Sequence, residues 1–183
     1  MLLNKESDFS LSEKIQVGIL SDTHNELNER ITAIINDCDI AIHAGDIGCR
    51  AVLELLQPKS GHVIAVAGNN DKPYLWDSED WHLVKNLPAI QQLMLPGGTI
   101  VIEHGHEYDM FRPEHQDLRN AHPDARLIIY GHTHIEVIDK DEPLCHVVNP
   151  GAAGFTRNKG GASCIVLTIE NNNWDYKVYK FSD

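Results

Sequence analysis

The chain is short of positive charge and has no long hydrophobic run. Its 183 residues carry 15 lysines and arginines against 27 aspartates and glutamates, so the formal net charge is −12. A field of that sign opposes general attraction to nucleic acid or to an anionic membrane. No apolar stretch approaches the length of a bilayer span, and charged residues appear too early for a signal peptide. We therefore expect a soluble protein without membrane or general nucleic-acid partners.

Paired cysteines are also absent. The four cysteines stand far apart, at positions 38, 49, 145 and 164, with no Cys-x-x-Cys motif. This usage predicts buried thiols in a reducing compartment, and hence a cytoplasmic protein, rather than a disulfide framework or a cysteine zinc site. Internal repeats, low-complexity segments and linkers are missing too. The sequence predicts an N-terminal tail at 1–13 and a single domain at 14–183, long enough to bury a core.

Apolar and amphipathic segments alternate in the first part of the chain. The pattern predicts strands at 15–20, 40–44 and 62–67, separated by helices at 26–36 and 51–57. Strand, helix, strand, helix, strand is typical of parallel crossovers with helices over the sheet. Further along, the pattern predicts strands at 99–102, 127–130, 135–138, 145–148, 163–169 and 174–181, with a weak helix at 113–121.

Histidine is abundant, with 11 residues, and several histidines follow predicted strands directly. Five strands end in polar loops: Asp22-Thr23-His24, Gly45-Asp46, Gly68-Asn69-Asn70-Asp71, His104-Gly105-His106 and Gly131-His132-Thr133-His134. In an open α/β sheet such loops meet at one edge. Oxygen and imidazole donors without thiolate suit Mn, Fe, Zn or Ni better than magnesium alone. Seven such ligands suit two ions that share one carboxylate.

Each motif alone has a plainer explanation. Asp-x-His can be a helix cap beside a surface histidine, and Gly-Asp after a strand is usually a turn. Five motifs in order, each at the end of a predicted strand, make a metal centre the better interpretation.

This ordered set resembles the calcineurin-like metallophosphoesterases. Within them it is most similar to the small single-domain phosphodiesterases, a branch that also includes the retromer subunit Vps29. The resemblance extends from about residue 15 to residue 169. It implies an α/β (α+β) fold, a β-sandwich flanked by helices, with a dimetal site at the carboxyl ends of the strands.

The resemblance also implies roles for individual residues. Asp22, His24 and His134 would hold one ion, Asp46 would bridge to the second, and Asn69, His104 and His132 would complete that second site. His106 would lie behind the ligands or face the substrate. The segment 149–152, Asn-Pro-Gly-Ala, matches a loop that the branch places near the metals, although a plain turn is an equal interpretation.

One departure from the wider family is chemical. Larger members carry a histidine, proposed as the proton donor to the leaving group, where this chain has Asn70. A carboxamide does not donate a proton as an acid, so that route is missing here. The remaining catalytic candidates are Asp46 and His106.

The expected reaction is hydrolysis of a small phosphodiester by a water that two divalent ions activate, with manganese favoured over Fe, Zn or Ni. Asp71 and nearby backbone carbonyls would orient the ligand imidazoles. Arg157 and Lys159 are candidate phosphate contacts, although solvated surface charge is the favoured interpretation of both.

The alternative is a metal-binding scaffold for protein partners of the Vps29 kind. Tyr74, Leu75, Trp76 and Trp81 would then form an apolar contact patch, with core packing an equal interpretation. A homo-oligomer is compatible with the sequence, which identifies neither the substrate nor the physiological metal.

Overall fold

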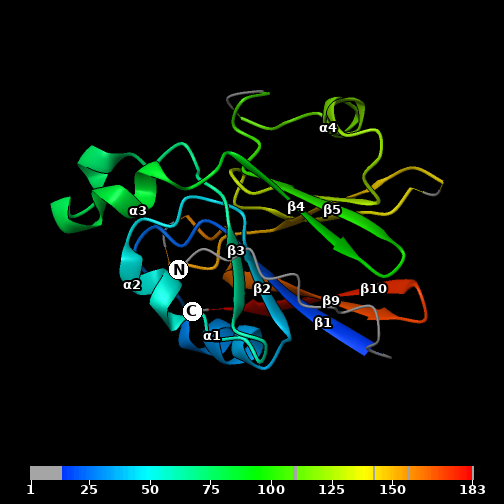
Figure 1. Cartoon of the computed structure of the whole chain (residues 1–183), viewed down its shortest axis with the longest axis horizontal. Coiled ribbons are helices and arrows are strands. Elements are labelled where there is room, and N and C mark those ends of the chain that lie inside the picture. The colour runs from blue at the N-terminus through cyan, green and yellow to red at the C-terminus, as the bar shows by residue number, and fades with distance from the viewer. Residues whose placement is uncertain (1–13, 109–110, 142, 156, 183) are drawn as a thin grey trace.

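The strands of the protein form two five-stranded sheets stacked face to face (Figure 1). The computed structural model describes residues 14–108, 111–141, 143–155 and 157–182. The tail expected at residues 1–13 lies outside this range. Sheet A has the order β10-β9-β1-β2-β3 and sheet B the order β4-β5-β6-β8-β7. This is the expected β-sandwich.

The bounds of the strands are as follows. Sheet A contains β1 (Lys14–Leu20), β2 (Ile40–His43), β3 (His62–Ala65), β9 (Ala162–Glu170) and β10 (Asn173–Phe181). Sheet B contains β4 (Ile90–Leu95), β5 (Gly98–Glu103), β6 (Leu127–Ile129), β7 (Glu136–Asp139) and β8 (His146–Pro150). The helices are α1 (Glu29–Asn36), α2 (Arg50–Leu55), α3 (Trp81–Lys85) and α4 (His115–Ala121), with 3₁₀ turns at Pro73–Leu75 and Ser78–Asp80.

Helices cover the outer faces of both sheets. In Figure 1, α1 lies below sheet A and α4 above sheet B. Ile31 and Ile35 of α1 are fully buried against Leu20 at the end of β1, and Leu118 of α4 is buried against Ile128 of β6. None of the helices in the described part of the chain is both long enough and apolar enough to cross a membrane.

The main core lies between the two sheets and follows from the alternation of side chains along each strand. Val17 and Ile19 of β1 point inward, as do Ile100 and Ile102 of β5, and all four are buried. Fully burying an aliphatic side chain of this size contributes about 1.5–3 kcal/mol. This contact fixes the two sheets relative to each other, and with them the loops at their ends.

The parallel crossovers expected in the first part of the chain are confirmed. β2 pairs in parallel with both β1 and β3. Helix α1 begins three residues later than the pattern predicts, because the side chain of Asn28 accepts a hydrogen bond from the Arg30 amide and caps it.

Two elements were missed by the sequence pattern: strand β4 and helix α3. Within the described part of the chain, β4 is an edge strand whose pairing partner is β5. Its outer face carries two exposed apolar side chains, Ile90 at 47% and Met94 at 81%, with the exposed Gln92 between them. Apolar residues therefore occur on both faces of β4, and the alternation that identifies a half-buried strand is lost. Helix α3 has only five residues, too few to show a helical period.

Sheet B repeats the parallel arrangement of sheet A. β5 pairs in parallel with β6, and β6 with β8. The carboxyl ends of these strands and those of β1–β3 face one another, since Gly131, just after β6, donates its amide hydrogen to the carbonyl of His104, and the His104 ring contacts the carbonyl of Ala44, just after β2. All five polar loops predicted from the sequence therefore meet at one end of the sandwich.

Candidate metal centre

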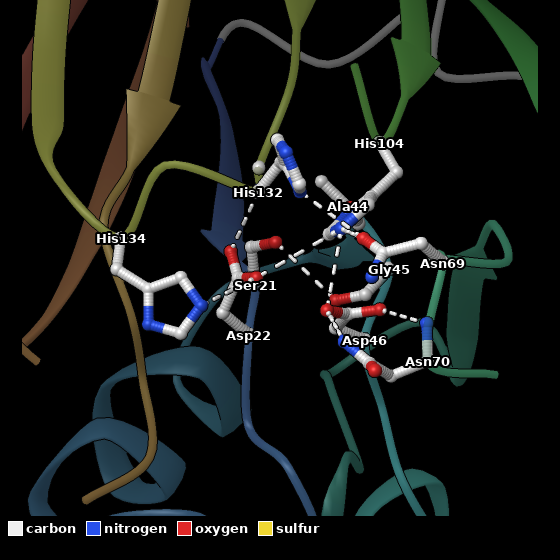
Figure 2. A network of polar contacts seen from close by, with 12 residues as sticks. Ser21, Asp22, Ala44, Gly45, Asp46, Asn69, Asn70, His104, His132 and His134 are labelled. Carbon is white, nitrogen blue, oxygen red and sulfur yellow. Dashed lines mark hydrogen bonds and ion pairs between the residues drawn. The ribbon is translucent and has the colours of Figure 1, made fainter. Parts of the chain in front are cut away.

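Imidazole nitrogens and carboxylate oxygens converge where these loops meet (Figure 2). Asp22 Oδ1 lies 3.2 Å from His134 Nε2 and 4.0 Å from His24 Nε2, and the two imidazole nitrogens are 3.2 Å apart. Asp22 is fully buried and His134 nearly so. These three residues form one group that could hold a metal ion, as the sequence predicts.

A second group surrounds Asp46. Its Oδ2 atom lies 3.4 Å from His104 Nε2 and 3.7 Å from His24 Nε2. Asn69 Oδ1 is 3.2 Å from His104 Nε2 and 3.1 Å from His132 Nδ1. Asp46 thus faces histidines of both groups. Asp22, Asp46 and His104 form the second group that could hold a metal ion, so Asp22 belongs to both groups, with its Oδ1 atom 4.0 Å from His104 Nε2.

Five of the seven predicted ligands have left-handed backbone conformations. The φ angles are positive at Asp22 (54°), His24 (46°), Asp46 (55°), His132 (68°) and His134 (59°). Such angles are uncommon in residues other than glycine, cost of order 1–3 kcal/mol each, and cluster at functional sites. The protein therefore holds these side chains in place at a conformational cost, which favours a functional role.

Hydrogen bonds between loops enforce these conformations. The amides of Asp22 and His24 donate to the carbonyls of Gly45 and Asp46, each at 3.0 Å. The amide of His132 donates to Asp22 Oδ2 at 3.0 Å. The loops after β1, β2 and β6 are therefore tied to one another, and their ligands are placed as a unit.

Two glycines allow the backbone to pass close to the side chains of Asp46 and Asp22. A Cβ atom at Gly68 would overlap Asp46 Oδ1, and one at Gly131 would overlap Ser21 Oγ and lie 2.9 Å from Asp22 Oδ2. A side chain at either position would displace a carboxylate.

The electrostatic environment keeps both carboxylates ionised. Burial alone would raise the pKa of Asp22 and of Asp46. For Asp22 the contacts with His134 and His104 outweigh burial, and for Asp46 the hydrogen bonds from His104 and Asn70 do so, and both pKa values are lowered. Burial also opposes charge on His104, but Asp46 and Asp22 raise its pKa to about 9. Without bound metal, a protonated His104 offsets part of the charge of the two buried carboxylates.

The residues present fit two divalent ions. Asp22 Oδ1 is buried and faces three imidazole nitrogens without a well-aligned hydrogen bond from any described residue. The donor set combines carboxylate, amide oxygen and imidazole, which suits first-row divalent metals. The Nδ1–H of His104 donates to the carbonyl of Ala44, 2.8 Å away, which directs Nε2 toward Asp46. The carbonyl contact expected for a ligand imidazole is therefore found.

His43 is a site residue that sequence reasoning missed. The Gly45 amide donates to His43 Nδ1 at 3.3 Å, so the ring proton is on Nε2 and is donated to Thr23 Oγ1 at 2.9 Å. Complete burial lowers the pKa of His43 to about 3, so the ring is neutral. It links the loops after β1 and β2 from behind the ligands. A histidine inside an otherwise apolar strand was the available signal.

Asp71 acts differently from the expectation that it would orient imidazoles. Its carboxylate accepts hydrogen bonds from the backbone amides of Ile47, Gly48 and Gly68 and from the indole nitrogen of Trp76. Among the described residues no histidine contacts it. Asp71 therefore fastens the loop that carries Asp46 to the loop that carries Asn69, and the earlier expectation is corrected.

Replacing Asp71 by Asn should destabilise the protein even without metal. The amide group would place N–H donors against backbone N–H donors in a buried position, which costs roughly 2–4 kcal/mol. Urea unfolding in the presence of a chelator measures this. Asp37→Asn, at a side chain that is 80% exposed, is the matched control. A loss for Asp71→Asn no greater than that of the control would contradict the role.

Asn70 and His106, the other two catalytic candidates, lie at different places in the site. Asn70 donates from its backbone and from Nδ2 to Asp46, at 2.8 and 2.7 Å. His106 lies beside His104, with ring centroids 5.3 Å apart, and its Nε2 contacts Glu107. Among the described residues, His106 belongs to neither of the groups that could hold a metal ion.

The remaining candidates divide between site, core and surface. Asn149 is buried and donates from Nδ2 to the carbonyl of Gly131 and to Thr133 Oγ1, so the loop at 149–152 supports the loop of His132 and His134. Trp76 is 5% exposed and belongs to the core, whereas Tyr74, Leu75 and Trp81 are exposed. The expected contact patch is reduced to those three residues.

Comparisons with known proteins agree with this geometry. The family model for the calcineurin-like phosphoesterase superfamily domain matches residues 15–172. A probable metallophosphoesterase of Methanothermobacter thermautotrophicus is 26% identical over 171 residues, covering 90% of this chain and 91% of that protein. One of Methanocaldococcus jannaschii is 29% identical over 158 residues, covering 81% and 73%. The zinc complex of Entamoeba histolytica Vps29 has the same fold, with a TM-score of 0.64, 15% identity and coverage of 92% and 100%.

Proposed function

The chain belongs to the calcineurin-like phosphoesterase superfamily, and from this we propose that it is a metal-dependent phosphodiesterase. Its relatives in sequence include a probable metallophosphoesterase, and Vps29 shares its fold. The observation that carries the proposal is the convergence of all seven predicted donors from both sheets. Monoesters would be poorer substrates. We further propose that residues 14–183 form one domain and that the protein is cytoplasmic, which its four free cysteines support.

Two divalent ions, manganese most favoured, would make water nucleophilic near neutral pH and offset the charge of the phosphoryl oxygens. The protein's own contribution is positional. Asp46 would bridge the two sites, because its Oδ2 faces both His24 and His104. Asn70 holds that carboxylate through two hydrogen bonds and has no acidic proton for the leaving group.

The test is hydrolysis of bis-p-nitrophenyl phosphate by the protein with added manganese. Activity that appears with manganese and disappears with a chelator supports the proposal. The same assay with p-nitrophenyl phosphate measures the preference for diesters. Protein that binds two ions per chain and hydrolyses neither compound would favour the alternative function, a protein-binding scaffold, for which Tyr74, Leu75 and Trp81 remain exposed.

Replacement of His104 and of His106 should separate two roles. His104→Ala removes an imidazole that faces Asp46 and Asn69, and should reduce the manganese bound per chain and the rise in Tm that manganese gives. His106→Ala should leave both nearly unchanged and alter turnover or substrate preference instead. Metal analysis and thermal unfolding measure the first pair of effects. The reverse pattern would exchange the two assignments.

A further inference from the structure

Arg157 reaches the candidate metal centre from the loop between β8 and β9. Its Nη2 atom lies 3.4 Å from His24 Nε2. The preceding segment is fixed against the loop of His24, because the Ala153 amide donates to the Ser21 carbonyl at 2.8 Å and a Cβ at Gly154 would overlap the Thr23 carbonyl. Arg157 itself has a φ of 55°, a strained angle for this residue type.

Arg157 has no acidic partner among the described residues, although the chain is strongly acidic. Two other arginines are paired with acids, Arg50 with Glu54 and Asp80, and Arg119 with Asp139. Arg126 instead donates to the backbone carbonyls of Gly97 and Asn172. The acceptor that Arg157 contacts is instead the ring nitrogen of His24, a residue of the first candidate metal group. The Arg157 guanidinium therefore has no carboxylate partner among the described residues, although it lies at the edge of the site. It is positioned to bind an anion that is not part of the protein.

Metal binding would change what Arg157 can contact. A ring nitrogen has one lone pair, and if it binds a metal it cannot also accept a hydrogen bond. The guanidinium would then need another acceptor on the His24 side of the site. A phosphoryl oxygen matches it, because the planar fork of arginine can donate two hydrogen bonds to two such oxygens.

We propose that Arg157 binds the phosphoryl group of the substrate on the His24 side of the metal centre. This proposal rests on the proposed phosphoesterase function and assigns a substrate contact to the side chain. It also separates Arg157 from Lys159, the other cation of this loop. Among the described residues, Lys159 makes its contact through its backbone carbonyl, which accepts a hydrogen bond from Lys180 Nζ, and its side chain does not contact the site.

The test measures inorganic phosphate binding to manganese-loaded protein by calorimetry. Arg157→Ala should weaken phosphate binding roughly tenfold or more, the effect of losing a charged hydrogen bond, and Arg157→Lys should fall between. Lys159→Ala removes the same charge two residues away and should change phosphate binding less than twofold. Manganese content should be unchanged in all variants. The kcat/KM for bis-p-nitrophenyl phosphate should fall in parallel with phosphate affinity.

Two outcomes would overturn the inference: phosphate affinity within twofold of wild type in Arg157→Ala, or an equal loss in Lys159→Ala, which would mean general charge attraction. A fall in kcat/KM without a fall in phosphate affinity would also reject it. Failure of the proposed function looks different. If wild-type protein hydrolyses no phosphate ester but binds phosphate through Arg157, the phosphoesterase activity is rejected and the anion contact stands.

Discussion

Asp46→Asn is expected to remove metal binding and hydrolysis together. Asp46 Oδ2 faces His24 of the first group at 3.7 Å and His104 of the second at 3.4 Å, and an amide keeps the shape of the side chain while losing its negative charge. The loss of activity should exceed the roughly 10–100-fold cost of changing a residue behind the ligands. Metal content per chain and turnover of bis-p-nitrophenyl phosphate measure the effect.

Two variants control this experiment. Asp175→Asn changes an aspartate that is 86% exposed and should behave as wild type. Asp22→Asn should lose one ion more than the other, since Asp22 lies nearest His134. Two ions per chain and near-normal turnover in Asp46→Asn would mean that Asp46 is not the bridge. If Asp22→Asn instead loses both ions, Asp22 takes that role.

Asn70→His is expected to accelerate hydrolysis of alkyl esters selectively. With asparagine, the leaving oxygen would depart as an anion, so nitrophenyl esters should react readily and alkyl esters slowly. A histidine has an unperturbed pKa near 6.5 and can protonate that oxygen, which is worth roughly 10²–10⁴-fold when well placed. Nitrophenyl leaving groups need no proton and should gain little. The measurement is kcat/KM for both substrate types.

The structure adds a control for this variant. Asn70 Nδ2 donates to Asp46 Oδ2, so any replacement also removes a hydrogen bond from the proposed bridge. Asn70→Ala removes the same bond without supplying an acid, and its metal content reports that loss alone. An equal change on both substrates in Asn70→His, relative to Asn70→Ala, would show that position 70 is not the place of the proton donor.

Much of the fold could be predicted because its signals are local. Buried strands such as β1 are continuous apolar runs, and each polar loop follows such a run directly. The residues of the candidate site could be grouped from the sequence because parallel strands place their carboxyl ends together. Strand β4 was not predictable, because its exposed Ile90 and Met94 hide the alternation.

The sequence pattern does not show in which direction a side chain points. Asp71 follows the ligand loop and was expected to orient imidazoles, yet its carboxylate turns toward three backbone amides. Arg157 was expected to be a solvated charge, yet a strained turn points it at His24. Rotamers and left-handed angles depend on contacts between residues far apart in the chain, so a pattern of neighbours cannot supply them.

The division of the ligands between the two sheets has a consequence for how the protein is made. Asp22, His24, Asp46 and Asn69 follow strands of sheet A, whereas His104, His132 and His134 follow strands of sheet B. Because chains emerge from the ribosome N-terminus first, the early half of the molecule presents mainly oxygen donors, and most of the imidazoles arrive later. If these residues hold the metals, a nascent chain would bind poorly those metals that prefer nitrogen ligands. Only after sheet B has docked does the full set of candidate ligands exist, so their order along the chain would delay selection of the metal until folding is nearly complete.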